Sequence, residues 1–141
     1  MKNISVLIID DSDEDRYLLK RQLGETSLKV TVFEKNNGQS AIDFLTDYEA
    51  NRNKYPDDFP PVILFLDINM PLLNGFEFLE EFATIREPNH MEASVVMMFT
   101  SSEREDDKLK IAAYDYVKSY LVKGSFSTEE LEQKIKQVLG D

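Results

Sequence analysis

The 141-residue chain contains no cysteine and a single histidine, His90. The lack of cysteine excludes disulfides, thiolate chemistry and cysteine-based zinc sites, and it fits a reducing compartment. One histidine without cysteine leaves no Ser-His-Asp or Cys-His catalytic set. The sequence also lacks a glycine-rich phosphate-binding loop and any internal repeat. Several common classes of enzyme are therefore excluded.

Positive charge is scarce, and long apolar runs are missing. The chain has 16 basic against 27 acidic residues, a formal net charge of −11. A surface this acidic repels phosphates, so we expect no direct contact with nucleic acid. Without a membrane span, a signal-like N-terminus or a lipidation motif, we expect a cytoplasmic protein. The length and the 42% hydrophobic content predict a single domain, residues 1–141.

The most informative segment is the apolar run at residues 62–66, Val-Ile-Leu-Phe-Leu, which ends in Asp67. Because polar residues do not alternate with the apolar ones, this strand should be buried on both faces, as in a parallel sheet covered by helices. In open α/β sheets, ligands bind at the carboxyl ends of the strands. Asp67 is therefore the first candidate functional residue.

Similar runs recur along the chain and predict five strands, at residues 4–9, 29–33, 62–66, 94–99 and 119–122. Helices are expected between them, including one over roughly 103–116 and a last one that starts at a Ser127/Glu130 capping box. The first helix, which we expect to end at Gly24, would bury Tyr17, Leu18 and Leu23.

Strands that alternate with helices predict a flavodoxin-like (βα)5 fold, a doubly wound parallel sheet of strand order 2-1-3-4-5 with five helices. Residues 50–61 are polar and contain three prolines, so we predict a loop or extended insertion there.

Polar side chains stand at the carboxyl ends of four neighbouring strands of this sheet: Asp10 and Asp11, Asp67, Thr100 and Lys123. Carboxylates held this close repel one another, which raises their pKa values, and a hard cation such as Mg²⁺ relieves the repulsion. An aspartate can also act as a nucleophile and form an aspartyl phosphate. A hydroxyl and a lysine beside it can bind the phosphoryl oxygens, so the set suits uptake of a phosphoryl group by Asp67.

These motifs resemble the receiver domain of two-component response regulators. The resemblance rests on Asp10-Asp11, Asp67-Ile68-Asn69-Met70-Pro71-x-x-x-Gly75, Thr100-Ser101 and Tyr120-Leu121-Val122-Lys123, and it covers about residues 4–139. It implies that Asp67 is the phosphoacceptor. It also implies that Mg²⁺, or Mn²⁺ in its place, is held by Asp10, Asp11, Asp67 and the backbone carbonyl of Asn69.

For the remaining residues, the resemblance implies that Lys123 pairs with Asp67 and then with a phosphoryl oxygen. Thr100 would bond the phosphoryl group, and Tyr120 would change rotamer as Thr100 moves. The protein would be a stand-alone regulator without independent substrate turnover. It would accept its phosphoryl group from a histidine kinase or a histidine phosphotransfer protein. It would act, as a monomer or as a phosphorylation-promoted homodimer, on an output protein that the sequence does not identify.

The chain departs from the family pattern in several places. Proline usually follows the lysine and aims it, whereas this chain has Gly124, and Tyr116-Val117 replaces the frequent Gly-Ala before the last strand. A phosphorylation-independent interaction module is therefore an alternative. A Mg²⁺-dependent phosphatase with an aspartate nucleophile is another, but such enzymes generally need an acid where this chain has Asn69.

Each candidate also has a plainer interpretation when taken alone. The acids from Asp10 to Asp15 could be a solvated helix start, Thr100 could cap the next helix, Lys123 could be a surface lysine and Tyr120 a core residue.

Overall fold

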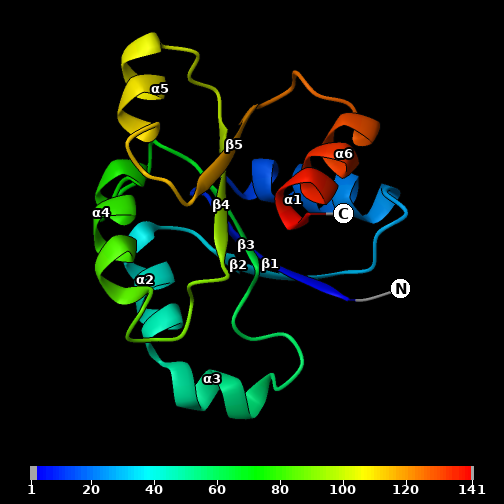
Figure 1. Cartoon of the computed structure of the whole chain (residues 1–141). Helices are drawn as coiled ribbons and strands as arrows, with labels where there is room; N and C mark the ends of the chain where they lie inside the picture. Colours follow the sequence, from blue (N-terminus) through cyan, green and yellow to red (C-terminus); the bar gives the residue numbers. More distant parts are fainter. Residues whose placement is uncertain (1–2, 141) are drawn as a thin grey trace.

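Continuous apolar runs form the centre of a five-stranded parallel sheet in the computed structural model, which describes residues 3–140 (Figure 1). The predicted fold class and the strand order β2-β1-β3-β4-β5 are confirmed. Every residue of β3 is buried, as are the last five residues of β1. The strands are β1 (Ile4–Ile9), β2 (Val30–Lys35), β3 (Ile63–Leu66), β4 (Val95–Thr100) and β5 (Val117–Val122).

Helices cover both faces of the sheet (Figure 1). Apolar residues of α1 and α6 pack on one face with Ile8 and Phe65, and those of α2, α4 and α5 pack on the other with Leu7 and Leu64. The helices are α1 (Asp13–Glu25), α2 (Gly38–Thr46), α3 (Tyr48–Lys54), α4 (Gly75–Ile85), α5 (Glu105–Ile111) and α6 (Thr128–Leu139). Within residues 3–140, none of the helices is long and apolar enough to cross a membrane.

The predicted count of five helices is wrong, because α3 adds a sixth between α2 and β3. We expected a loop at residues 50–61, but its first half continues this helix. The prolines of the segment all follow Lys54, so they do not interrupt α3. Tertiary contacts hold the helix in place. The ring of Tyr48 lies 5.6 Å from that of the buried Phe59, and the Asn51 amide donates a hydrogen bond to the Phe44 carbonyl at 2.7 Å.

Two local predictions were also wrong. In α1, Tyr17 is 58% exposed and Leu18 is 47% exposed, whereas Leu19 and Leu23, one turn apart, are buried. The helix expected over residues 103–116 is only seven residues long, because it begins at Glu105 and ends at Ile111, and a turn over residues 112–116 leads into β5.

Helix starts are fixed by side-chain caps where the chain leaves the strand ends. Ser12 accepts a hydrogen bond from the Asp15 N–H at 3.1 Å at the start of α1. Asn74 with Glu77 forms a capping box at the start of α4, and the predicted box at Ser127 starts α6. The caps orient α1 and α4 as they leave the loops that follow β1 and β3.

Candidate functional site

The ends of β1 and β3 place two aspartates side by side. Asp10 directly follows β1 and Asp67 directly follows β3, and the Asp67 N–H donates to the Ile9 carbonyl at 3.0 Å. Asp10 is fully buried and Asp67 is 5% exposed. The polar ends of buried strands thus bring carboxylates into a largely water-free edge of the sheet.

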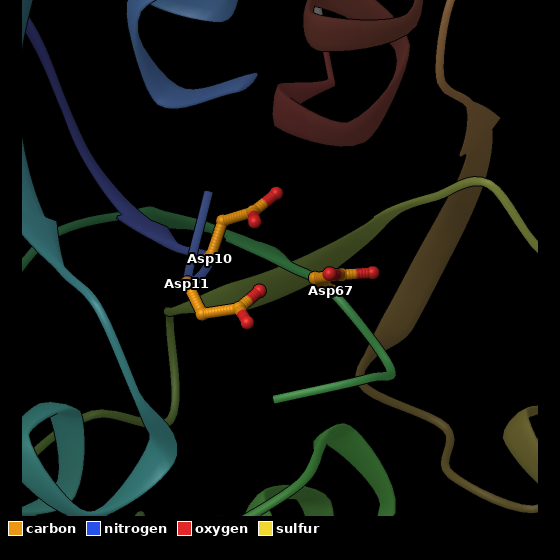
Figure 2. Close-up of side chains that lie close together, drawn as sticks. All are labelled: Asp10, Asp11 and Asp67. Carbon is orange, nitrogen blue, oxygen red and sulfur yellow. The ribbon is translucent and has the colours of Figure 1, made fainter. Parts of the chain in front are cut away.

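A third carboxylate completes a cluster. One carboxylate oxygen from each of Asp10, Asp11 and Asp67 lies within 4.8 Å of the other two, although Asp11 is exposed. Figure 2 shows Asp10 and Asp11 at the end of β1, beside Asp67 at the end of β3. One Asp67 oxygen, Oδ1, accepts a hydrogen bond from the Ile68 N–H at 2.8 Å. Its other oxygen, Oδ2, faces Lys123.

Lys123 turns its ammonium into this cluster. Its Nζ lies 2.8 Å from Asp10 Oδ2 and 3.3 Å from Asp67 Oδ2, and the side chain is only 15% exposed. The Lys123–Gly124 peptide bond is trans. Gly124 has φ +77° in a tight turn, in which the Ser125 N–H donates to the Val122 carbonyl at 3.0 Å. The lysine therefore reaches Asp67 although proline does not follow it.

Burial and ion pairing shift the pKa values of two of these groups. Burial is the largest effect on Asp10 and raises its pKa, the Asp67 charge adds to this, and the Lys123 ammonium only partly opposes them. Burial alone would lower the pKa of Lys123. Its contacts with Asp10 and Asp15 and the charge of Asp67 outweigh burial and raise that pKa. Lys123 therefore stays charged, while the ionised form of Asp10 is disfavoured by its burial.

The donor set fits a divalent cation. Asp10 Oδ2 is buried and accepts no aligned hydrogen bond from residues 3–140, even though Lys123 lies at ion-pair distance. A buried carboxylate oxygen whose lysine partner is poorly aligned can accept a bound cation as a further partner. Carboxylate oxygens at this spacing are ligands that Mg²⁺ and Mn²⁺ prefer, so Asp10, Asp11 and Asp67 could hold such an ion.

The other predicted residues lie around this cluster. Thr100 is the last residue of β4, is fully buried, and accepts the Lys123 N–H at its carbonyl at 2.9 Å. It does not cap α5, whose N-cap is Arg104. The half-buried Tyr120 donates its hydroxyl hydrogen to the Ser102 carbonyl at 2.7 Å. Asn69 is exposed in the loop after Asp67.

Sequence reasoning missed one residue that contacts the site. Asp15 Oδ2 lies 2.8 Å from Lys123 Nζ, although the two residues are 108 positions apart in the chain. We had interpreted Asp15 only as part of the helix start. Five acids among the six residues from Asp10 to Asp15 are the available signal, but nothing in the sequence links Asp15 to Lys123.

A doubly wound sheet that brings three aspartates, a buried threonine and an inward-facing lysine to the carboxyl ends of β1, β3, β4 and β5 defines the receiver domain of two-component signalling proteins. The chain matches the response regulator receiver domain family over residues 6–136 and belongs to it.

Relatives of similar size agree with this classification. The chain is 28% identical to response regulator Rcp1 of Synechocystis sp. over 136 residues, which cover 96% of this chain and 84% of that protein. It is 27% identical to a chemotaxis protein CheY homolog of Campylobacter jejuni over 137 residues, covering 97% and 93% of the two chains. The crystal structure of a two-component response regulator from Cytophaga hutchinsonii covers the whole of both chains with a TM-score of 0.82 and 29% identity.

Proposed function

We propose that the protein is a response regulator that accepts a phosphoryl group on Asp67 from a phosphohistidine, with Mg²⁺ or Mn²⁺ as cofactor. One observation carries the proposal. The buried Asp67 carboxylate has the Lys123 ammonium 3.3 Å from Oδ2 and belongs to a group of three carboxylates whose oxygens lie within 4.8 Å of one another. In this arrangement Asp67 can act as the nucleophile. Lys123 and a bound cation can supply the positive charge that a phosphoryl group requires.

In the proposed reaction an oxygen of Asp67 attacks the phosphorus of the phosphohistidine. A P–O bond forms, the P–N bond breaks, and the imidazole leaves as a neutral ring that keeps the proton already on its other nitrogen. Lys123 pairs with a phosphoryl oxygen, and the Thr100 hydroxyl donates a hydrogen bond to another. A bound divalent cation supplies further positive charge for the phosphoryl oxygens. Asp10 and Asp11, with Asp67 and the Asn69 carbonyl, would hold that cation.

Phosphorylation would then be read at a surface of the protein. Tyr120 lies on β5, and its hydroxyl bonds the Ser102 carbonyl in the loop that follows Thr100. A movement of Thr100 toward a phosphoryl group would change this loop and release or redirect the Tyr120 ring. We propose a histidine kinase or a histidine phosphotransfer protein as the donor, and a separate output protein as the reader of this change.

Phosphotransfer to the isolated protein tests this function. Wild type incubated with acetyl phosphate and Mg²⁺ should show a phosphorylation-dependent mobility shift that Asp67→Asn lacks. Beryllofluoride with Mg²⁺ should likewise change the NMR spectrum around Thr100 and Tyr120 in wild type alone. If wild type and Asp67→Asn behave identically in both assays, the proposed function is wrong.

The alternative of a phosphorylation-independent module rested on Gly124. The inward direction of Lys123 removes its main support, because the lysine reaches Asp67 with glycine in the next position. A phosphatase is disfavoured by Asn69, which offers no acid two residues after the nucleophile. Turnover of a panel of phosphomonoesters would instead support the phosphatase alternative.

A further inference from the structure

The Lys123 ammonium is bound by a residue that the proposed reaction does not use. Asp15, in the first turn of α1, places Oδ2 at 2.8 Å from Nζ, closer than the 3.3 Å that separates Nζ from Asp67. Asp15 lies outside the group of carboxylates that could hold a metal ion. Its side chain is 32% exposed, so this carboxylate lies at the mouth of the site.

The residue that follows Lys123 offers no side chain to aim it. Gly124 has φ +77°, and a Cβ added at this glycine would meet no atom within 4 Å. The long lysine side chain has many rotamers, and fixing one of them requires contacts along its length or at its end. The Phe99 ring, whose centroid lies 5.3 Å from Nζ, supplies one such contact.

The backbone of Asp15 is anchored at the start of α1. Its N–H donates to Ser12 Oγ at 3.1 Å in the N-cap of α1, and α1 packs on the sheet through the buried Leu19 and Leu23. The other two acids that contact Lys123, Asp10 and Asp67, belong to the reacting cluster. Their oxygens would be shared with a cation and a phosphoryl group. Among the acids of residues 3–140 that contact Lys123, Asp15 is thus the one that takes no part in the proposed metal and phosphoryl contacts.

We propose that Asp15 is a positioning residue that anchors the Lys123 ammonium over Asp67 in this chain, where glycine stands in place of the usual proline. The inference rests on the proposed function. Asp15 acts through Lys123 and does not itself touch the phosphoryl group. Its removal should therefore slow phosphoryl uptake only as long as Lys123 is present.

A double-mutant cycle tests this dependence on Lys123. With acetyl phosphate at saturating Mg²⁺, Asp15→Asn should lower the rate of phosphorylation roughly tenfold, below the roughly hundredfold that a 1 Å misplacement of a catalytic group can cost. Glu14→Gln removes the same charge from an exposed position in the same turn and should leave the rate unchanged. In a Lys123→Met background, Asp15→Asn should have almost no further effect. An equal effect in both backgrounds would overturn the inference.

A second measurement needs neither phosphate nor metal. In the metal-free protein, the ¹⁵N-labelled Lys123 ammonium should give a slowly exchanging NMR signal, assigned by its absence in Lys123→Met. The signal should persist in Glu14→Gln and broaden or vanish in Asp15→Asn. If wild type takes up no phosphoryl group, the proposed function fails and this signal alone decides whether Asp15 anchors Lys123. An unchanged signal in Asp15→Asn would show that it does not.

Discussion

At the level of single residues, the charges favour a cation at the proposed site. Asp10, Asp15 and Asp67 share the Lys123 ammonium, and Asp11 lies beside Asp10 and Asp67. Burial raises the pKa of Asp10, so the ionised cluster costs stability unless positive charge is added. A lysine that contacts three of these acids offsets part of this cost. A divalent ion would offset more of the negative charge.

The location of a single residue in the fold can be predicted from the sequence where the residue ends or directly follows a strand. Asp10, Asp67 and Thr100 end or directly follow buried apolar runs, so their placement at one edge of the sheet could be expected from the sequence. The contact between Asp15 and Lys123 could not, because it depends on how α1 packs beside the turn after β5. Such packing is a tertiary property that no local pattern encodes.

A surface residue offers a prediction about pH. Glu132 on α6 accepts two 2.8 Å hydrogen bonds from Ser27, from its N–H and its hydroxyl, and pairs with Lys136. These contacts lower the pKa of Glu132 from 4.5 to about 2. A carboxyl with a depressed folded-state pKa stabilises the protein above its unfolded pKa, and the contribution is lost as pH falls through the folded value.

Thermal unfolding of Glu132→Gln checks this prediction. The variant should melt below wild type at pH 7, and the difference should shrink as the pH falls from about 4.5 toward 2. The control Glu129→Gln changes an exposed acid on the same helix and should show no such dependence. A difference in Tm that stays constant across this pH range would contradict the role assigned to Glu132.

At the level of elements, the strands were easier to predict than the helices. Apolar runs buried on both faces are a strong signal for strands such as β1 and β3. The helix α3 is hard to predict because its residues precede three prolines in the same polar segment, and prolines favour a loop. The exposed Tyr17 and Leu18 misled the choice of face in α1, since three adjacent apolar residues do not define one face of a helix.

The start of α4 depends on a close approach of two backbones. A Cβ added to Gly75 would lie 2.5 Å from the Asp67 carbonyl oxygen and 2.7 Å from Ile68 Cα. Gly75→Ala should therefore push α4 away from the loop that carries Asp67 and destabilise the protein by about 1–3 kcal/mol. Urea unfolding measures the change.

The matched control is Gly24→Ala in α1, where a Cβ would meet no atom within 4 Å. This change should raise stability by up to about 1 kcal/mol, because alanine favours helix more than glycine does. If Gly75→Ala is as stable as wild type, the close packing of α4 against the Asp67 loop does not matter for stability.

At the level of the whole molecule, a formal net charge of −11 and a cluster of three carboxylates, two of them buried, together predict that divalent cations stabilise the fold. An ion that binds only the folded state adds RT ln(1 + [L]/Kd), about 1.4 kcal/mol at ten times Kd. Mg²⁺ should therefore raise Tm by several degrees. KCl at matched ionic strength should not, since screening alone does not fill the site.

Variants separate site binding from a general charge effect. The Mg²⁺-dependent rise in Tm should be lost in Asp11→Asn, which removes one of the three carboxylates. It should persist in Asp47→Asn, which removes the same single negative charge at an exposed position between α2 and α3. Equal rises in both variants would place the bound Mg²⁺ outside the proposed site.

The central claim is that Asp67 itself carries the phosphoryl group, and locating that group tests it most directly. After incubation with acetyl phosphate and Mg²⁺, borohydride reduces an aspartyl phosphate to homoserine, which peptide mass spectrometry assigns to a position. We predict homoserine at position 67 in wild type and at no position in Asp67→Asn. Homoserine at another aspartate, or none in wild type under conditions that phosphorylate a known receiver domain, would contradict the account.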